Sequence, residues 1–127
     1  METTTTRKTA FFVDDDKAFL DAITYVVEHP GFDIKTYTVQ NGYQTIDHII
    51  RVKPHILFID FNLPHANGGQ IIPILKAVEG FSKLPIYVVT GYPKEAVEPF
   101  LSDLDLNGII QKDEHFTKEI LKALDRT

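Results

Sequence analysis

Residues 56–60 read ILFID, a run of four apolar residues that ends in a single acid. Two further runs have the same form. AFFV at 10–13 precedes three aspartates, and IYVV at 86–89 precedes Thr90. Short, continuous, β-rich apolar runs are typical of central strands that are buried on both faces. We therefore predict three central strands, each followed by a polar residue.

The segments around these runs complete an alternating pattern. Residues 32–38 alternate like an edge strand, and residues 108–111 form a short fifth strand candidate. Apolar side chains recur at helical spacing in 19–27, 43–50, 70–78 and 116–124, and a weaker pattern covers 94–104. We expect Pro73 to lie in the first turn of its helix and Pro99 to break the weak one. Strands that alternate with helices predict a parallel sheet with helices on both faces.

The length and composition indicate one domain. A chain of 127 residues, 43% of them hydrophobic, has the usual size of a single fold and can form a core. The sequence contains no cysteine, which excludes disulfides, zinc–thiolate sites and thiol catalysis. Residues 1–8 are polar, and we predict a flexible N-terminal tail there, followed by a domain that spans residues 9–127.

The charge and hydropathy patterns exclude some partners. Thirteen Lys and Arg against eighteen Asp and Glu give a net charge of −5. A net anion repels the phosphate backbone, so we expect no direct nucleic-acid binding. No apolar run approaches the ~20 residues that a membrane span needs, and no signal sequence is visible. We therefore expect a cytoplasmic protein with no membrane partner.

Polar side chains follow the ends of four predicted strands. Asp14 and Asp15 follow the first apolar run, Asp60 the second, Thr90 the third, and Lys112 the last. The carboxyl ends of parallel strands meet at one edge of a sheet, where ligands bind. Three acids gathered there repel one another by about 4 kcal/mol per pair at ~4 Å and an effective dielectric of ~20. Such a cluster persists only with protonation, a neighbouring cation or a metal. Hard oxygen ligands without His or Cys favour Mg²⁺.

The neighbouring polar residues have more ordinary interpretations. Asp16 is predicted to cap the first helix, because Asp is favoured at helix N-termini. Asn67-Gly68 is a pair typical of turns. Five histidines are scattered without metal-ligand spacing, and we interpret them as surface or packing residues: His29, His48, His55, His65 and His115.

Taken together, these segments resemble the response-regulator receiver domains of two-component signalling. FFVDDD at 11–16 is similar to the family's first acidic motif, and FIDFNLP at 58–64 is similar to its phosphoacceptor segment. VVTG at 88–91 and GIIQK at 108–112 resemble the strands that bear its switch hydroxyl and its site lysine. The resemblance covers about residues 9–126. It implies a flavodoxin-like, doubly wound α/β fold with five parallel strands in the order 2-1-3-4-5 and five helices.

The resemblance also implies roles for the site residues. Asp60 is expected to accept a phosphoryl group, and Lys112 to neutralise charge on the phosphoryl oxygens during the transfer. The hydroxyl of Thr90 is expected to hydrogen-bond the phosphorylated Asp60 and so to shift a two-state equilibrium. The implied ligands of Mg²⁺ are the carboxylates of Asp14, Asp15 and Asp60 and the backbone carbonyl of Asn62. We expect no dedicated enzyme, because such a protein catalyses only its own phosphorylation and dephosphorylation.

The partners implied by the resemblance are proteins. The phosphoryl donor is expected to be a sensor histidine kinase or a histidine phosphotransfer protein, and the output an unidentified protein target. The expected oligomeric state is a monomer or a weak dimer through the fourth helix, fifth strand and fifth helix. That face carries Phe100, Leu101 and Leu104.

Two positions depart from the family pattern. Asp113 follows Lys112 where the family usually has proline, so we expect a loop without the usual cis peptide and an extra anion near Lys112. Ile109 stands where an aromatic switch residue is common. We therefore expect a switch that does not use a side-chain swing at residue 109, and Tyr92 is one candidate to replace it.

Two other functions remain open on the sequence alone. A receiver-like module could bind a partner constitutively, without phosphorylation. A phosphatase of the haloacid-dehalogenase type also uses an aspartate nucleophile with Mg²⁺, but it needs a second Asp two residues further on, where this chain has Asn62. Flavin or nucleotide binding is disfavoured, because no glycine-rich loop follows the first strand.

Overall fold

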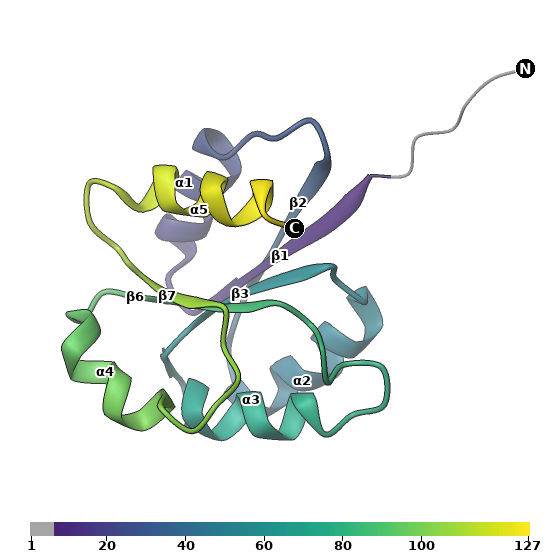
Figure 1. The fold of residues 1–127 in the computed structure, drawn as a ribbon, viewed down its shortest axis with the longest axis vertical. Coiled ribbons are helices and arrows are strands. Elements are labelled where there is room, and N and C mark those ends of the chain that lie inside the picture. The colour runs from purple at the N-terminus through teal and green to yellow at the C-terminus, as the bar shows by residue number, and fades with distance from the viewer. Residues whose placement is uncertain (1–6) are drawn as a thin grey trace, which may run out of the picture.

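A computed structural model describes residues 7–127 and shows one central sheet with helices on both faces (Figure 1). The sheet contains β1 (Lys8–Asp14), β2 (Phe32–Thr38), β3 (Ile56–Asp60), β6 (Ile86–Thr90) and β7 (Gly108–Gln111). All neighbouring strands are parallel, and their order is β2-β1-β3-β6-β7. The predicted order 2-1-3-4-5 is confirmed, because β6 and β7 are the fourth and fifth strands of this sheet.

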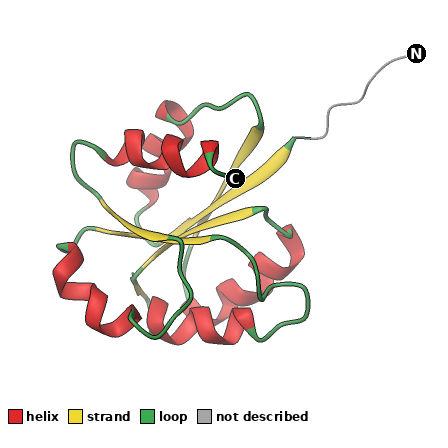
Figure 2. Cartoon of the chain, viewed as in Figure 1, coloured by secondary structure: helices red, strands yellow, loops and turns green. Residues whose placement is uncertain are grey.

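Five helices cover the two faces of the sheet. They are α1 (Lys17–Val26), α2 (Gly42–Val52), α3 (Gly68–Lys76), α4 (Lys94–Leu101) and α5 (Phe116–Asp125). Helices α1 and α5 lie on one face, and α2, α3 and α4 lie on the other (Figures 1 and 2). None of the helices in the described residues is long and apolar enough to cross a bilayer.

The central strands are apolar on both faces because each face has its own core. Phe11 and Val13 pack into the core under α2, α3 and α4, while Phe12 packs into the core under α1 and α5. On that second face the ring of Phe58 stacks on Phe12, with centroids 4.4 Å apart, and on Tyr87 at 5.5 Å. This row of rings crosses β1, β3 and β6 and fixes their lateral positions, which also aligns the strand ends.

The first strand begins one residue earlier than the predicted domain boundary. Lys8 pairs in register with Phe32 on β2, and Arg7 forms an ion pair with Asp33, with Nε 2.8 Å from Oδ1. Pairing with β2 therefore extends the fold to Arg7 and Lys8, which the sequence assigned to the tail. Residues 1–6 of that predicted tail lie outside the described residues.

The prediction for Pro73 was wrong, whereas the fourth helix does end near Pro99. Pro73 lies in the second turn of α3, and α4 continues past Pro99 to end at Leu101. Both prolines are exposed, and each removes one backbone donor from its helix. The buried side chains of Ile72 and Leu101 hold the two helices against the sheet, and this packing outweighs the lost hydrogen bond.

A short hairpin after β3 was not predicted. Strands β4 (Asn62–Leu63) and β5 (Ala66–Asn67) pair antiparallel, with His65 at a φ of 68° in the turn between them. Asn67 then caps α3, because its side chain accepts from the backbone N–H of Gln70 at 3.1 Å. The Asn67-Gly68 pair is therefore the start of a helix, and the turn itself lies just before it.

We predict that the stacked rings dominate the stability of the sheet. Phe58→Ala should lower the free energy of unfolding by about 3–5 kcal/mol, because Phe58 is fully buried and its loss leaves a cavity. Tyr25→Ala is the matched control, since Tyr25 is 90% exposed and should change stability by less than about 0.5 kcal/mol. Urea unfolding measures both values, and equal losses would contradict this account of the core.

Candidate functional site

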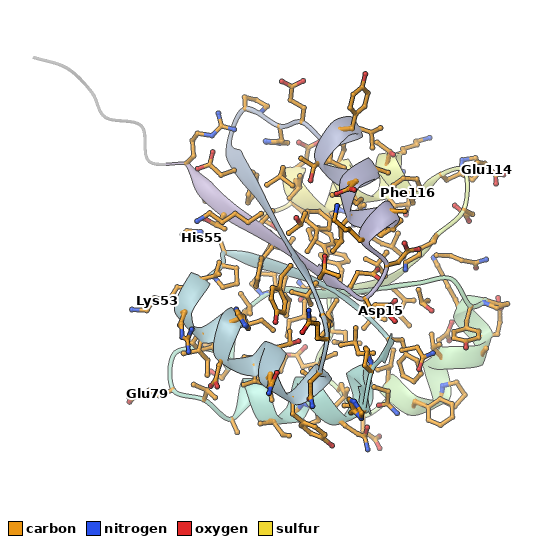
Figure 3. The ribbon with its side chains drawn as sticks, turned by 180° about the vertical axis from the view of Figure 1, so that it is seen from behind. Asp15, Lys53, His55, Glu79, Glu114 and Phe116 are labelled. Atoms are coloured by element: carbon orange, nitrogen blue, oxygen red, sulfur yellow. The ribbon has the colours of Figure 1, made fainter. Side chains whose placement is uncertain are left out.

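Four strand ends bring the predicted site residues to one edge of the sheet. Asp14 ends β1, Asp60 ends β3, Thr90 ends β6, and Lys112 directly follows β7. The side chains of the first three are buried, with exposed fractions of 2%, 7% and 0%. Asp15 follows β1 and is exposed in the loop that leads to α1 (Figure 3). The strand register therefore places three buried polar side chains and one exposed acid at the same edge of the sheet.

Two of the three clustered carboxylates share one cationic side chain. One oxygen from each of Asp14, Asp15 and Asp60 lies within 4.8 Å of the other two. The Nζ atom of Lys112 is 2.7 Å from Oδ2 of Asp14 and 3.2 Å from Oδ2 of Asp60. The cluster thus contains three carboxylates and one ammonium group, which contacts two of them, so it keeps an excess of negative charge.

Backbone donors fix the second oxygen of each buried acid. The N–H of Asp16 donates to Oδ1 of Asp14 at 2.9 Å, and the N–H of Asn62 donates to Oδ1 of Asp60 at 3.3 Å. Because Lys112 holds the other oxygen of each acid, both carboxylates have defined orientations. The sequence did not predict these two donors, since backbone N–H groups carry no signature in the side-chain pattern.

The electrostatics of the cluster favour a bound cation. Burial raises the pKa of Asp14 to about 6, assisted by the charge of Asp60 and opposed by hydrogen bonds from Lys112 and from the Asp16 N–H. Burial and the charge of Asp14 also raise the pKa of Asp15. Burial lowers the pKa of Lys112, but the hydrogen bond to Asp14 and the charge of Asp60 outweigh it, so the net shift is upward. The ammonium therefore persists at neutral pH, and it leaves repulsion between the acids that a divalent cation would offset.

The hydroxyl of Thr90 is tied to the loop that follows β6. Its Oγ1 accepts from the backbone N–H of Tyr92 at 3.1 Å. A hydroxyl that accepts one hydrogen bond can still donate its own proton to an oxygen in the cluster. Thr90 therefore lies between the acidic site and the start of α4.

The loop after Lys112 is organised by Asp113. Its Oδ1 accepts from the N–H of His115 at 2.8 Å, and its carbonyl oxygen accepts from the N–H of Phe116 at 3.2 Å. The expectation of a loop without a cis peptide is confirmed, as residues 7–127 contain none. The acidic partners of Lys112 are Asp14 and Asp60, whereas the Asp113 carboxylate closes the turn before α5.

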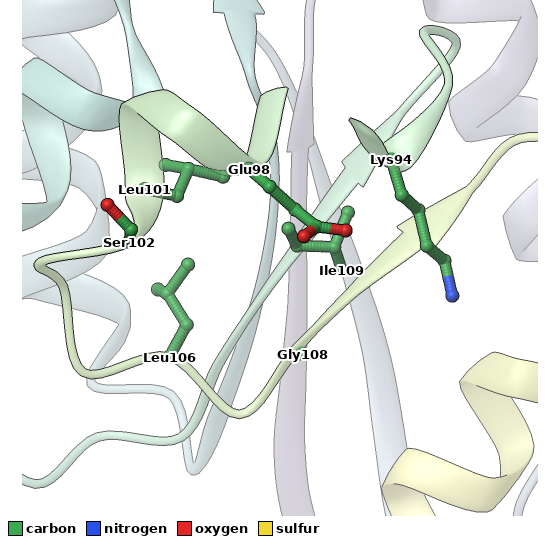
Figure 4. A pocket seen from close by; sticks show the side chains of 7 residues that line it. All are labelled: Lys94, Glu98, Leu101, Ser102, Leu106, Gly108 and Ile109. Carbon is green, nitrogen blue, oxygen red and sulfur yellow. The ribbon is translucent and has the colours of Figure 1, made fainter. Parts of the chain in front are cut away.

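Ile109 lines a cavity on the far side of β7 from α5. This cavity has a volume of about 360 Å³ and lies between α4 and β7, with Leu101, Leu106 and Ile109 on its apolar side (Figure 4). Ile109 is half-buried and packs against the core under α2, α3 and α4. Lys94 and Glu98 of α4 supply its charged groups.

Of the three apolar residues expected on the partner face, one is well exposed. Phe100 is 64% exposed, and its ring contacts Phe61 with centroids 5.7 Å apart. Leu101 is buried, and Leu104 is packed partly against the core. Leu101 and Leu104 therefore stabilise the fold, and Phe100 is the member of this set that a partner could touch.

Three of the histidines have structural partners outside the acidic cluster, as predicted for surface or packing residues. Nε2 of His29 is 2.9 Å from Oδ1 of Asp125, and the ring of His48 stacks on Tyr37. Nδ1 of His55 accepts from the N–H of Thr9 at 2.9 Å. Asp16 also behaves as predicted, because its Oδ1 accepts from the N–H of Phe19 at the start of α1.

One contact of the site, between Lys112 and Phe19, was not predicted from the sequence. The Nζ atom of Lys112 lies 4.4 Å from the centroid of the Phe19 ring. The helical spacing of residues 19–27 predicts only that Phe19 lies on the apolar face of the first helix. Its place one turn after the three aspartates was the signal that could have linked it to the site.

A parallel sheet that collects three acids, a hydroxyl and a lysine at its carboxyl edge defines an α/β domain of the receiver type. A family model described as "Response regulator receiver domain" matches residues 10–125. The chain therefore belongs to the response-regulator receiver domain family, and the resemblance inferred from its motifs is confirmed.

Curated relatives share part of their length with this chain. It is 30% identical over 87 residues to the DNA-binding response regulator MtrA of Mycolicibacterium smegmatis, an alignment that covers 68% of this chain and 36% of MtrA. It is 23% identical over 97 residues to a protein-glutamate methylesterase/protein-glutamine glutaminase of Archaeoglobus fulgidus, covering 76% of this chain and 27% of that protein. The chain thus spans about a third of the length of these relatives or less.

Solved structures support the fold. A putative response regulator from Chloroflexus aurantiacus aligns with a TM-score of 0.81 at 19% identity, covering 95% of this chain and 97% of that one. The response regulator TrrA from Thermotoga maritima, in complex with Mg²⁺-BeF, aligns with a TM-score of 0.78 at 17% identity, covering 94% and 99%. At such identities the likeness shows a common architecture.

We predict that Asp14 destabilises the metal-free protein at neutral pH. Its folded pKa of about 6 lies above the ordinary value of 3.8, so the folded state binds this proton more tightly than the unfolded state. The resulting loss of stability is complete above pH ~6 and absent below pH ~4. Asp14→Asn should therefore raise the free energy of unfolding in EDTA at pH 8 by an amount on the order of 2 kcal/mol.

Urea unfolding between pH 4 and pH 8 measures this effect. The gain in Asp14→Asn should shrink as the pH falls and vanish near pH 4. Asp21→Asn is the matched control, because Asp21 is exposed and pairs only with Lys17 on the same helix. A loss of stability in Asp14→Asn at pH 8 would show that the ion pair with Lys112 outweighs the cost of burying the carboxylate.

Proposed function

We propose that this domain accepts a phosphoryl group on Asp60 in a Mg²⁺-dependent reaction and thereby switches protein interactions in signal transduction. The observation that carries the proposal is the placement of the Lys112 ammonium, which contacts both Asp60 and Asp14 at the carboxyl edge of the sheet. Membership of the receiver family supports the same reaction.

The acceptor in this proposal is the carboxylate of Asp60. A carboxylate attacks phosphorus without a general base, because its anion is already the nucleophile. One oxygen of Asp60 forms a bond to phosphorus as the bond from phosphorus to the donor group breaks, and the donor leaves with that electron pair. The hydrogen bonds from Asn62 N–H and Lys112 Nζ hold the carboxylate still during this exchange.

The proposed metal ligands are the carboxylates of Asp14, Asp15 and Asp60 and the backbone carbonyl of Asn62. The residues fit Mg²⁺, because they offer hard oxygen donors whose carboxylate atoms lie within 4.8 Å of one another. When bound, Mg²⁺ supplies positive charge that offsets the acids and the phosphoryl oxygens. The Mg²⁺-BeF complex of TrrA supports this assignment by similarity of fold.

Lys112 and Thr90 act on the phosphoryl oxygens. The Lys112 ammonium stabilises their charge in the transition state, because it is fixed in place before the reaction. The Thr90 hydroxyl then donates a hydrogen bond to the phosphorylated Asp60. Since Oγ1 of Thr90 also holds the N–H of Tyr92, a shift of this hydroxyl moves the loop before α4.

The proposed path from Thr90 to the surface uses three aromatic residues, which lie after β3, before α4 and near the end of α4. Tyr92 is half-exposed and lines a cavity of about 240 Å³ together with Phe61 and Phe100. Phe61 directly follows Asp60, so both site loops contribute to this cavity. We propose that it changes shape on phosphorylation, in place of a side-chain swing at Ile109. A bias of ~3 kcal/mol between two states shifts their ratio by more than 100-fold.

The proposed partners are proteins. The phosphoryl group comes from the phosphohistidine of a sensor histidine kinase or a histidine phosphotransfer protein, and the output is a protein target. The domain is proposed to be a monomer or a weak dimer through α4, β7 and α5, where Phe100 is exposed. A haloacid-dehalogenase-type phosphatase is disfavoured, because the amide of Asn62 cannot serve as a general acid.

Phosphorylation by acetyl phosphate tests the proposal. With Mg²⁺, the wild-type protein should gain one base-labile phosphoryl group, measured by intact mass, and Asp60→Asn should gain none. Asp105→Asn is the matched control, because Asp105 is exposed in the loop before β7. Equal labelling of wild type and Asp60→Asn would eliminate Asp60 as the acceptor. A folded wild-type protein that takes no label would favour constitutive partner binding.

Mg²⁺ binding should weaken as the pH falls. The pKa of Asp14 is about 6, so below that value a proton competes with the metal for this carboxylate. Calorimetric titration should give nearly constant affinity between pH 7 and pH 8 and a loss of about tenfold per pH unit below pH ~6. An affinity that is unchanged down to pH 5 would contradict the assignment of Asp14 as a ligand.

A further inference from the structure

The ammonium of Lys112 lies between two acids and an aromatic ring. Its Nζ is 2.7 Å from Asp14, 3.2 Å from Asp60 and 4.4 Å from the centroid of the Phe19 ring. The ring of Phe116 packs on Phe19, with centroids 5.4 Å apart and an interplanar angle of 50°. Two aromatic rings from different helices therefore form one wall of the site.

We propose that Phe19 is a positioning residue for phosphoryl transfer, whose ring keeps the Lys112 ammonium at the two buried carboxylates. This inference rests on the function proposed above. It assigns a role to Phe19, a residue to which the family motifs in the sequence assign none.

A contact that holds the Lys112 ammonium is useful because the lysine side chain is flexible. Lys carries a point charge on a flexible four-carbon stem, and it loses rotamer entropy when it is held in one place. The carboxylates attract Nζ, and the face of the Phe19 ring, 4.4 Å away, adds a second attraction and covers the ammonium. Phosphorylation changes the shape and charge of Asp60, but it leaves the ring of Phe19 unchanged. The ring contact can therefore hold the ammonium while its anionic partner changes.

Local hydrogen bonds connect this ring to the acidic segment. Asp16 donates its N–H to Asp14 and accepts from the N–H of Phe19 at 3.2 Å, so the same residue orients an acid of the site and the start of α1. On the other side, the carbonyl of Asp113 accepts from the N–H of Phe116. Helices α1 and α5 lie side by side on one face of the sheet (Figures 1 and 3). Their first turns thereby bring the two rings together beside Lys112.

A purely structural role for Phe19 makes a different prediction. Phe19 is half-buried and packs against the core under α1 and α5, so its removal costs stability in any case. If packing were its whole role, the loss would not depend on the identity of residue 112. The experiment must therefore measure the rate of phosphorylation and its dependence on Lys112.

The rate measurement uses acetyl phosphate with saturating Mg²⁺. Phe19→Leu should slow phosphorylation by about fivefold, which corresponds to about 1 kcal/mol for a cation–π contact. Phe19→Tyr keeps the ring face and should stay within about twofold of wild type. In a Lys112→Gln background, Phe19→Leu should change the residual rate by less than about twofold. Leu121→Ala controls for lost packing, because Leu121 lies against the same core, and it should lower stability without changing the rate.

A spectroscopic measurement tests the contact without any phosphorylation. In NMR spectra of the labelled protein, the Hε protons of Lys112 should be shifted upfield by the Phe19 ring. The shift should persist in Phe19→Tyr and disappear in Phe19→Leu, and the signal should be absent in Lys112→Gln. An Hε signal that is unchanged in Phe19→Leu would overturn the contact.

The outcomes separate this inference from the proposed function. A wild-type protein that takes no phosphoryl group overturns the proposed function, and the positioning role with it. A normal wild-type rate that Phe19→Leu leaves unchanged overturns the role of Phe19 alone. An equal slowing by Phe19→Leu with and without Lys112 also overturns it, because the ring would then act through packing.

Discussion

One ammonium group holds the functional edge of this domain together. The side chain of Lys112 contacts Asp14 and Asp60, which come from different strands and form a cluster with a third acid, Asp15. Without it, two buried carboxylates would face each other across neighbouring strand ends with only backbone donors to hold them. The same charge imbalance that makes this edge costly to fold makes it receptive to a divalent cation.

The fold supplies the rigidity that this arrangement needs. The rings of Phe12, Phe58 and Tyr87 stack across three strands beneath the site, so the strand ends cannot slide independently. The hydroxyl of Thr90 accepts a hydrogen bond from the loop before α4, and α4 is a helix of 8 residues that contains Pro99. Under the proposed function, a chemical change at Asp60 that moves this hydroxyl would therefore act on the loop before α4.

Much of this structure could be predicted from the sequence, for identifiable reasons. Continuous apolar runs placed the three central strands, because strands buried on both faces cannot carry polar residues. The polar residue after each run then located the site, since parallel strands end at one edge. Other features depend on neighbours that are distant in sequence. Residue spacing does not show that Pro73 is tolerated where Ile72 is buried, that the backbone of Asn62 donates to Asp60, or that Phe19 reaches Lys112.

The central claim is that Lys112, Thr90 and the metal ligands converge on one phosphoryl group at Asp60. A crystal structure of this protein grown with Mg²⁺ and beryllofluoride tests it most directly, because that anion mimics a phosphoryl group on a carboxylate. The account predicts beryllofluoride on Asp60, with Nζ of Lys112 and Oγ1 of Thr90 within hydrogen-bond distance of its fluorines and Mg²⁺ held by Asp14 and Asp15. Beryllofluoride at another residue, or Lys112 turned away from Asp60 in that complex, would contradict it.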